Sequence, residues 1–257
     1  KAVDWYGRTP LWASIELRNM DVDSSTFENG VDRAPSLELV KVLLDKGVDA
    51  NARIKEVPPI RRQMLHVTGD LSWVDFTGQT PFLRAALAAD LDVMRLLLAH
   101  GADPKMPAFA GTTALMAAAG VDWVVDQTWD EGPAARLEAV KLCYDLGMSV
   151  NDANSMGITA VMGAANRGSD DIIQFLVSKG AKLDAKDKEG RTPLTWAEGV
   201  FLATHPAKPK PSAPSSSTGS GSGATSSRTR PTTKSARASS SAPTRRRASS
   251  APRWLNH

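Results

Sequence analysis

The chain has 257 residues, of which 42% are hydrophobic and 23% charged, and its formal net charge is +3. This composition indicates a soluble chain with enough apolar residues for a sizeable core. No apolar stretch of the chain is long enough to cross a bilayer as a helix, so no membrane-spanning segment is expected. The single cysteine excludes an internal disulfide but leaves the compartment open, so we expect a soluble protein, cytoplasmic by default.

One short phrase recurs along the chain: Gly-x-Thr-Pro/Ala followed by an apolar residue. The five copies begin at Gly7, Gly78, Gly111, Gly157 and Gly190. The interval from Gly78 to Gly111 equals the interval from Gly157 to Gly190, and the other two intervals are longer. The Thr can cap the free N–H groups of a helix, and Pro at the first helical position loses no hydrogen bond. We therefore expect a short helix after each phrase.

A second helix is predicted to close each repeat unit. Amphipathic runs that end in glycine occupy residues 37–47, 91–101, 137–147 and 170–180. Glycine supplies the left-handed residue that follows a helix end. In the two regular units, the run closes at Gly101 or Gly180 and the next phrase begins at Gly111 or Gly190. The longer intervals indicate insertions inside unit one, between units one and two, and inside unit three.

This pattern resembles the ankyrin repeat over about residues 1–204. The resemblance implies an all-α solenoid of stacked helix-turn-helix units with short extended finger turns. The units are expected near residues 4–51, 75–107, 108–153, 154–186 and, in part, 187–204. The histidine that usually follows Thr-Pro-Leu in this family is absent. Its positions hold Trp12, Leu83, Met116, Met162 and Thr195.

The last part of the chain, residues 206–257, has a different composition. It carries seven Arg, three Lys and no acidic residue, a net charge of +10, whereas residues 1–205 carry −7. It is rich in Ser, Thr, Pro and Ala, which bury too little surface to offset the entropy of ordering, so a disordered tail is expected. An altered reading frame or a recent sequence replacement is an alternative account of this segment. Weak, salt-sensitive polyanion binding is expected of such a tail.

The resemblance also implies where a partner binds. Ankyrin repeats usually bind partners at the turn tips and on the inner face of the first helices. By register, the tip positions are the two residues before each phrase glycine and the one after it. The candidate partner-binding residues are Trp5, Tyr6, Arg8, Phe76, Gln79, Phe109, Thr112, Met156, Ile158, Lys188 and Arg191. Trp5, Phe76 and Phe109 share one register position and are expected to form an exposed aromatic ladder. The alternative is that the insertions bury them.

The insertions, within residues 20–36, 52–73 and 121–132, form a second candidate surface. Their candidate contact residues are Trp73, Trp123 and Trp129. Two interpretations stay open for these side chains. They bind a partner, or they dock each loop onto the repeats.

No catalytic, metal or cofactor site is predicted. A possible calcium loop opening at residues 21–25 has Thr26 where Gly is required and Asp32 where a bidentate Glu is required. The four histidines lack the spacing of zinc ligands. Cys143 is expected to be a buried apolar residue.

The sequence therefore predicts a non-catalytic, monomeric protein-binding scaffold with an unidentified protein partner. The alternative is a regulatory or targeting module that its basic tail anchors to nucleic acid or an anionic surface. Because the chain begins within a repeat and without Met, a lost signal peptide, earlier repeats and export all stay open.

Overall fold

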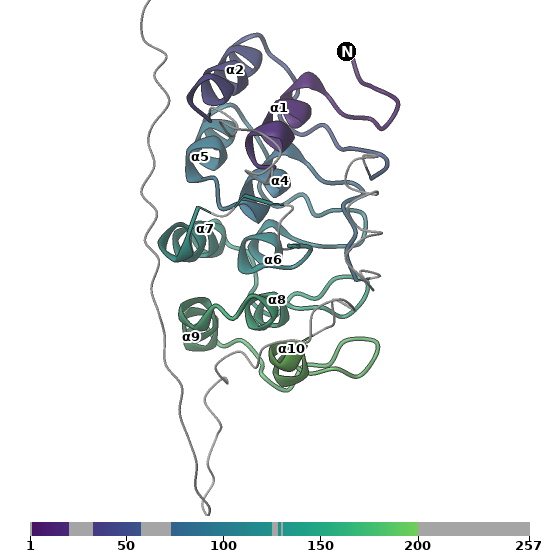
Figure 1. Cartoon of the computed structure of the whole chain (residues 1–257), viewed down its shortest axis with the longest axis vertical. Coiled ribbons are helices and arrows are strands. Elements are labelled where there is room, and N and C mark those ends of the chain that lie inside the picture. Colours follow the sequence, from purple (N-terminus) through teal and green to yellow (C-terminus); the bar gives the residue numbers. More distant parts are fainter. Residues whose placement is uncertain (1, 21–32, 58–72, 125–127, 130, 200–257) are drawn as a thin grey trace, which may run out of the picture. The chain divides into compact units, whose positions relative to one another are not determined.

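The computed structural model describes residues 2–20, 33–57, 73–124, 128–129 and 131–199, all within one compact unit, Lys1–Ser215. Its helices lie in two layers, and the turns between units project on one side (Figure 1). The layer of first helices contains α1 (Pro10–Arg18), α4 (Pro81–Leu87), α6 (Ala114–Ala119), α8 (Ala160–Arg167) and α10 (Pro193–Gly199). The layer of second helices contains α2 (Arg33–Asp45), α5 (Leu91–Ala99), α7 (Pro133–Asp145) and α9 (Asp170–Ser178).

Neighbouring helices of each layer contact one another in chain order. The predicted all-α solenoid is therefore confirmed. Among the described residues, strand-like pairing is limited to two isolated bridges. No helix in this part of the chain combines the length and apolar character that a bilayer crossing requires.

Threonine side chains begin most of the first helices, as the phrase predicts. The hydroxyl oxygens of Thr9 and Thr80 each accept a hydrogen bond, at 3.1 Å, from the backbone N–H three residues later. Thr113 and Thr192 make the same contact at 3.4 Å. Thr159 is the exception, because its hydroxyl is buried and forms no cap within the described residues.

Two second helices are longer than the sequence predicts. α5 and α9 begin at the expected residues, whereas α2 and α7 begin four residues early, at Arg33 and Pro133. Pro133 stands at the start of α7, where a proline loses no helical hydrogen bond. The end of the insertion in unit one, residues 33–36, is therefore helical, and α7 starts directly after the insertion of unit three.

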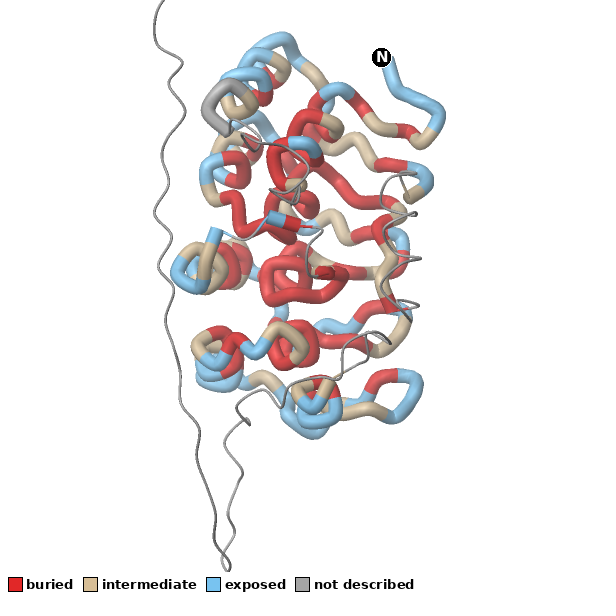
Figure 2. Tube along the Cα trace, in the orientation of Figure 1, coloured by how far each residue is buried: buried red, intermediate tan, exposed pale blue. Residues whose placement is uncertain are grey.

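The layer of first helices is the most deeply buried part of the array (Figure 2). Every residue of α4 and α6 is buried, and so are the first six residues of α8. The second helices bury one side only. Cys143 of α7 is fully buried, as expected, and burial raises the pKa of its thiol to about 12, which leaves it unreactive near neutral pH.

Charged side chains lie inside the first-helix layer, which hydrophobic patterning does not predict. Arg84 of α4 forms an ion pair with Glu16 of α1 and donates to the carbonyl of Asn19 at 2.8 Å. Beside it, Arg18 Nε lies 2.7 Å from Asp90 Oδ2. All four charged side chains are at most 6% exposed. Removal of one member of such a pair destabilises the fold, because the other charge stays buried without compensation.

The insertions of units one and three meet each other across unit two. Met20 forms an antiparallel bridge with Thr128, and the N–H of Trp129 donates to the carbonyl of Asn19 at 3.0 Å. That carbonyl also accepts the hydrogen bond from Arg84. The two loops are thus tied to the buried charges between units one and two.

Three expectations fall outside the described residues. They are the tail from residue 206, the possible calcium loop at 21–25, and most of the insertion that precedes Trp73.

Candidate functional site

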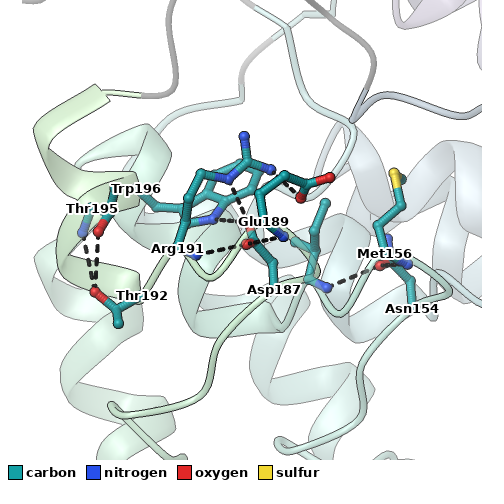
Figure 3. Close-up of polar contacts among 9 residues, drawn as sticks. Asn154, Met156, Asp187, Glu189, Arg191, Thr192, Thr195 and Trp196 are labelled. Carbon is teal, nitrogen blue, oxygen red and sulfur yellow. Dashed lines mark hydrogen bonds and ion pairs between the residues drawn. The ribbon is translucent and has the colours of Figure 1, made fainter.

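Each finger, the extended turn that leads to a first helix, is closed at its tip by hydrogen bonds. In unit five, Asp187 Oδ1 accepts from the N–H groups of Glu189 (3.1 Å) and Arg191 (2.8 Å). Asp187 Oδ2 accepts from Arg191 Nε (2.6 Å) and Trp196 Nε1 (2.9 Å), as Figure 3 shows. Burial acts to raise the pKa of Asp187, but these hydrogen bonds outweigh it and hold the pKa below its usual value.

The same closure recurs in units one and four. Asp4 Oδ1 accepts from the N–H groups of Tyr6 (3.0 Å) and Arg8 (2.8 Å). Asn154 Oδ1 accepts from the two equivalent N–H groups, both at 3.0 Å. A side chain that satisfies two backbone donors fixes the conformation of the turn.

Backbone hydrogen bonds also join each fingertip to the next. In each one, an N–H of one finger donates to a carbonyl of the finger before it. These bonds run from Lys55 to Tyr6 (2.8 Å), Phe109 to Thr77 (3.0 Å), Ser155 to Ala110 (2.6 Å) and Lys188 to Met156 (2.9 Å). The fingertips therefore form one continuous, backbone-linked row.

Glycine is required in this row for two reasons. Gly78 and Gly157 both have φ of 77°, a left-handed conformation. A Cβ on Gly78 would lie 2.6 Å from the backbone nitrogen of Phe109, and one on Gly157 would lie 3.0 Å from the Cα of Asp187. The phrase glycine thus permits adjacent fingers to approach.

The finger of unit two is interrupted at its tip by an insertion. The N–H of Ile54 donates to the carbonyl of Gln79 (3.2 Å), and the N–H of Gly78 donates to the carbonyl of Ile54 (3.0 Å). Asn154 forms the equivalent pair of hydrogen bonds in the uninterrupted finger of unit four. Ile54 therefore occupies the turn-closing position of unit two, and Lys55 occupies the exposed tip position after it.

The expectation that Phe76 is an exposed tip residue is wrong. Its side chain is 4% exposed and belongs to the core. The reason is the register just described, because Lys55 occupies the place that counting back from Gly78 gives to Phe76. The chain that returns from the insertion instead contacts unit three, where the N–H of Asp75 donates to Asp122 Oδ1 at 3.1 Å.

The position after each phrase glycine also differs from the expected contact surface. Gln79, Thr112 and Ile158 are at most 2% exposed. They begin the return from the tip to the first helix, and the Thr112 hydroxyl accepts from Asn154 Nδ2 at 3.3 Å. Arg8 and its unit-five equivalent are partly exposed, but each is paired with the aspartate of its own turn at 2.6 Å.

The exposed tip residues form what we call the fingertip edge. It consists of Trp5, Lys55, Phe109, Ser155 and Lys188. Trp5 is 88% exposed and Phe109 60% exposed. Tyr6 and Met156, which follow two of these residues, are half-buried. The structure thus brings part of the predicted tip surface into one row and adds Lys55 to it.

Two of the three tryptophans of the insertions contact the array with their rings. The ring of Trp73 packs edge-on against Trp196 of α10, with centroids 5.4 Å apart. The guanidinium of Arg167, at the end of α8, lies 4.2 Å from the ring centroid of Trp123. Trp129 is 40% exposed. These contacts favour a docking role for Trp73 and Trp123.

Two family models match the chain. One, described as ankyrin repeats in three copies, matches residues 134–199, and another, a single ankyrin repeat, matches residues 77–106. Residues 77–106 and 134–199 are thus similar to ankyrin repeats, in agreement with the resemblance seen in the sequence.

Curated relatives match only in part. Human ankyrin repeat domain-containing protein 63 is 32% identical over 123 residues, which are 47% of this chain and 30% of that protein. An ankyrin repeat-containing protein of Schizosaccharomyces pombe is 29% identical over 75 residues, 29% of this chain and 36% of its own length. Rat M-phase phosphoprotein 8 is 41% identical over 69 residues, 26% of this chain and 8% of that protein. The matched segment spans at most 36% of each of these relatives.

Ankyrin repeats are generally non-catalytic protein-interaction modules, which agrees with the function predicted from the sequence. Within the described residues, no three His, Cys, Asp or Glu side chains are arranged to hold a metal ion. His100 is engaged in structure, since its ring nitrogens lie 2.8 Å from the carbonyl of Leu96 and 3.1 Å from Asp45 Oδ1. These two hydrogen bonds raise the pKa of His100.

Proposed function

We propose that this ankyrin array is a scaffold that binds a protein partner along its fingertip edge. The observation that carries the proposal is the exposure of two large aromatic side chains, Trp5 at 88% and Phe109 at 60%, on fingers linked by backbone hydrogen bonds. An aromatic on a rigid element loses little conformational entropy when it becomes buried against a partner. Such side chains commonly dominate the binding free energy of an interface.

The inner face of the first helices supports binding less well. The residues of α4 and α6 are already buried, and Trp73 and Phe76 pack into the same core. A partner would find little of these helices accessible. The proposal therefore rests on the tips.

Photo-crosslinking in the full chain tests this function. A benzophenone amino acid at position 109 should crosslink a partner from a cell extract, whereas the same group at position 177 should not. Val177 is a matched control, because it is also apolar and is 41% exposed, but it lies on α9. In an affinity pull-down without the crosslinker, the double variant Trp5→Ala/Phe109→Ala should no longer retain the partner that crosslinking identifies, and it should keep the thermal stability of the parent. Unchanged capture by this variant would refute the proposal.

A second proposal concerns the basic tail. Residues 206–257 carry a charge of +10 without any carboxylate, which favours attachment to a polyanion. Binding to duplex DNA should weaken steeply with salt, with each neutralised phosphate adding about 0.9 to the log–log slope. Deletion of residues 206–257 should abolish this binding. Binding that survives the deletion would exclude the tail as the anchor.

A further inference from the structure

The fingertips are basic although the array is acidic. Residues 1–205 carry a net charge of −7. The five tip segments comprise residues 4–8, 53–56, 108–112, 154–158 and 186–191, and they contain six basic and four acidic side chains. The excess positive charge lies in segments 53–56 and 186–191, whereas the segments that carry Trp5 and Phe109 have no net charge.

Most of the tip carboxylates are already paired within their own turns. Asp4 pairs with Arg8 at 2.6 Å. Arg191 pairs with Asp187 at 2.6 Å and with Glu189 at 2.9 Å. These ion pairs leave little negative charge free to oppose an anion.

Two lysines of the fingertip edge are available for a partner. Lys55 and Lys188 are exposed, and within the described residues neither ammonium group has a carboxylate partner. Two residues before Lys55 in the sequence, the guanidinium of Arg53 lies 5.4 Å from the ring centroid of Phe109. Positive charge therefore lies next to an exposed aromatic ring.

The edge also has a defined order. Along the hydrogen-bonded row, Trp5 is followed by Lys55, then Phe109, then Ser155 and finally Lys188. Apolar and basic side chains thus alternate over the first three fingers, and a second basic site lies at the last. A segment of chain laid along this row meets these sites one after another.

We infer that the partner presents to the fingertip edge an acidic peptide segment with apolar side chains between its carboxylates. This inference rests on the proposed function. The apolar side chains of the segment pack against Trp5 and Phe109, and its carboxylates pair with Lys55 and Lys188. Complementary charges favour the encounter and reject segments of the opposite sign.

A nucleic acid fits the edge less well. Binding of a polyanion depends on the number of phosphates that the protein neutralises, and the edge offers two lysines without a carboxylate partner among its described residues. The surrounding charge of −7 in residues 1–205 opposes a uniformly anionic chain. A short acidic peptide needs fewer compensating charges.

Selection of peptides against the full chain tests this inference. A library of short random peptides is displayed and selected in the presence of excess free peptide 206–257, which removes binders of the tail. The selected peptides should be rich in Asp and Glu interspersed with apolar residues. Peptides without this acidic enrichment, or no selected peptides at all, would overturn the inference.

Charge reversal then locates the binding of the selected peptides. In the full chain, Lys55→Glu/Lys188→Glu should weaken them by about tenfold or more, because two attractions become repulsions. The matched control Arg230→Glu/Arg237→Glu changes the net charge equally, but in the tail, and should change affinity less than about threefold. The milder variant Lys55→Gln/Lys188→Gln should give an intermediate loss. Circular dichroism and melting curves of each variant should match those of the parent.

The outcomes separate this inference from the proposed function. If the selected peptides bind the lysine variants as tightly as the parent but bind Trp5→Ala/Phe109→Ala more weakly, the proposed function stands and the inference of an acidic partner is overturned. If the affinity of the peptides is unchanged by substitution of any of the four edge residues, both the inference and the proposed function are overturned. Equal weakening in the tail control would show that the tail binds the peptides and would overturn the inference. Poly(U) RNA bound through Lys55 and Lys188 more tightly than the selected peptides would also overturn it.

Discussion

The layer of first helices and the fingertip edge are both surfaces that the ankyrin resemblance implies for binding, yet they differ in what holds them together. The first helices are held by buried side chains, including the Glu16–Arg84 pair and the ring of Phe76. The fingertips are held mainly by backbone hydrogen bonds and, in units one, four and five, by an aspartate or asparagine side chain that closes the turn. The edge residues Trp5 and Phe109 are left exposed.

This difference separates stability from recognition. A side chain in the first-helix layer contributes to the free energy of unfolding through burial and ion pairing. A side chain on the fingertip edge contributes little to it, because the backbone rather than the side chain maintains the row. Substitutions at the edge are therefore free to change the partner while the array stays folded. The predictions below compare the two regions, from the largest expected effect on stability to the smallest.

Arg84→Met should have the largest effect. It removes the guanidinium that pairs with Glu16, which is 3% exposed, and the hydrogen bond to the Asn19 carbonyl. Loss of one member of a buried pair leaves an uncompensated charge and typically costs about 3–5 kcal/mol. Urea unfolding followed by circular dichroism measures the change. The double variant Glu16→Leu/Arg84→Met should recover part of this loss. A loss in the double variant equal to the sum of the losses in Glu16→Leu and Arg84→Met would contradict the assigned pairing.

Phe76→Ala should destabilise the array by about 3 kcal/mol, since deletion of a buried phenylalanine usually costs about 3–5 kcal/mol. The physical cause is the cavity that the ring leaves in the core, where its exposed fraction is 4%. Equilibrium unfolding of the variant gives the change directly. A loss below about 0.5 kcal/mol, typical of surface positions, would mean that Phe76 lies on the edge after all.

The failure at Phe76 shows how far sequence reasoning reaches. The phrases predict where the first helices start because threonine capping depends only on neighbouring residues. Counting back from Gly78 misplaces the tip because the insertion enters the finger itself. A usable signal was present in the count forward from the closing glycine. Lys55 follows Gly47 at the same spacing at which Phe109 follows Gly101.

The buried charges could not be predicted in the same way. Arg84 occupies a register position that holds Ala117 in unit three and Gly163 in unit four, so the repeat pattern favours a small residue there. Its partner Glu16 lies 68 residues away in the sequence. Their pairing depends on how α1 and α4 pack, which periodicity does not specify. Periodicity does not predict the partner-binding residues either, since the exposure of the tip side chains depends on how the insertions fold.

Asp122→Asn should make stability depend less on pH. Burial raises the pKa of Asp122 to about 7, although hydrogen bonds from the Asp75 N–H and Thr112 act to lower it. Because the unfolded pKa is near 3.8, the folded state binds the extra proton between these values. The stability of the parent should therefore fall as pH rises from about 4 towards 7, by about 1.4 kcal/mol for each pKa unit of the shift.

Unfolding free energies at pH 4.5 and 6 measure this slope. In this range Asp4 and Asp187, whose pKa values are lowered, stay ionised, and the raised pKa of His100 keeps it protonated. Asn tolerates the left-handed φ of 65° at this position and can still accept from Asp75. The variant should therefore show a smaller decline than the parent. An equal decline in both proteins would assign the slope to other groups.

Trp5→Ala and Phe109→Ala should have the smallest effects on stability, within about 0.5 kcal/mol of the parent for Trp5→Ala and within about 1 kcal/mol for Phe109→Ala. Their rings are 88% and 60% exposed, so truncation opens no cavity, and the backbone bond from Phe109 to Thr77 does not involve the ring. Phe109→Ala removes the ring beneath Arg53, an exposed cation–π contact of about 0.5–1 kcal/mol, so it should cost slightly more than Trp5→Ala. Each variant should nevertheless weaken the binding of the partner by about 2 kcal/mol, as truncation of an aromatic anchor commonly does. Melting curves give the stability of each variant, and titration of the same samples with the partner identified by crosslinking gives the binding free energy. A stability loss as large as that of Phe76→Ala would mean that the edge and the first-helix layer are held in the same way, and the separation of stability from recognition would then fail.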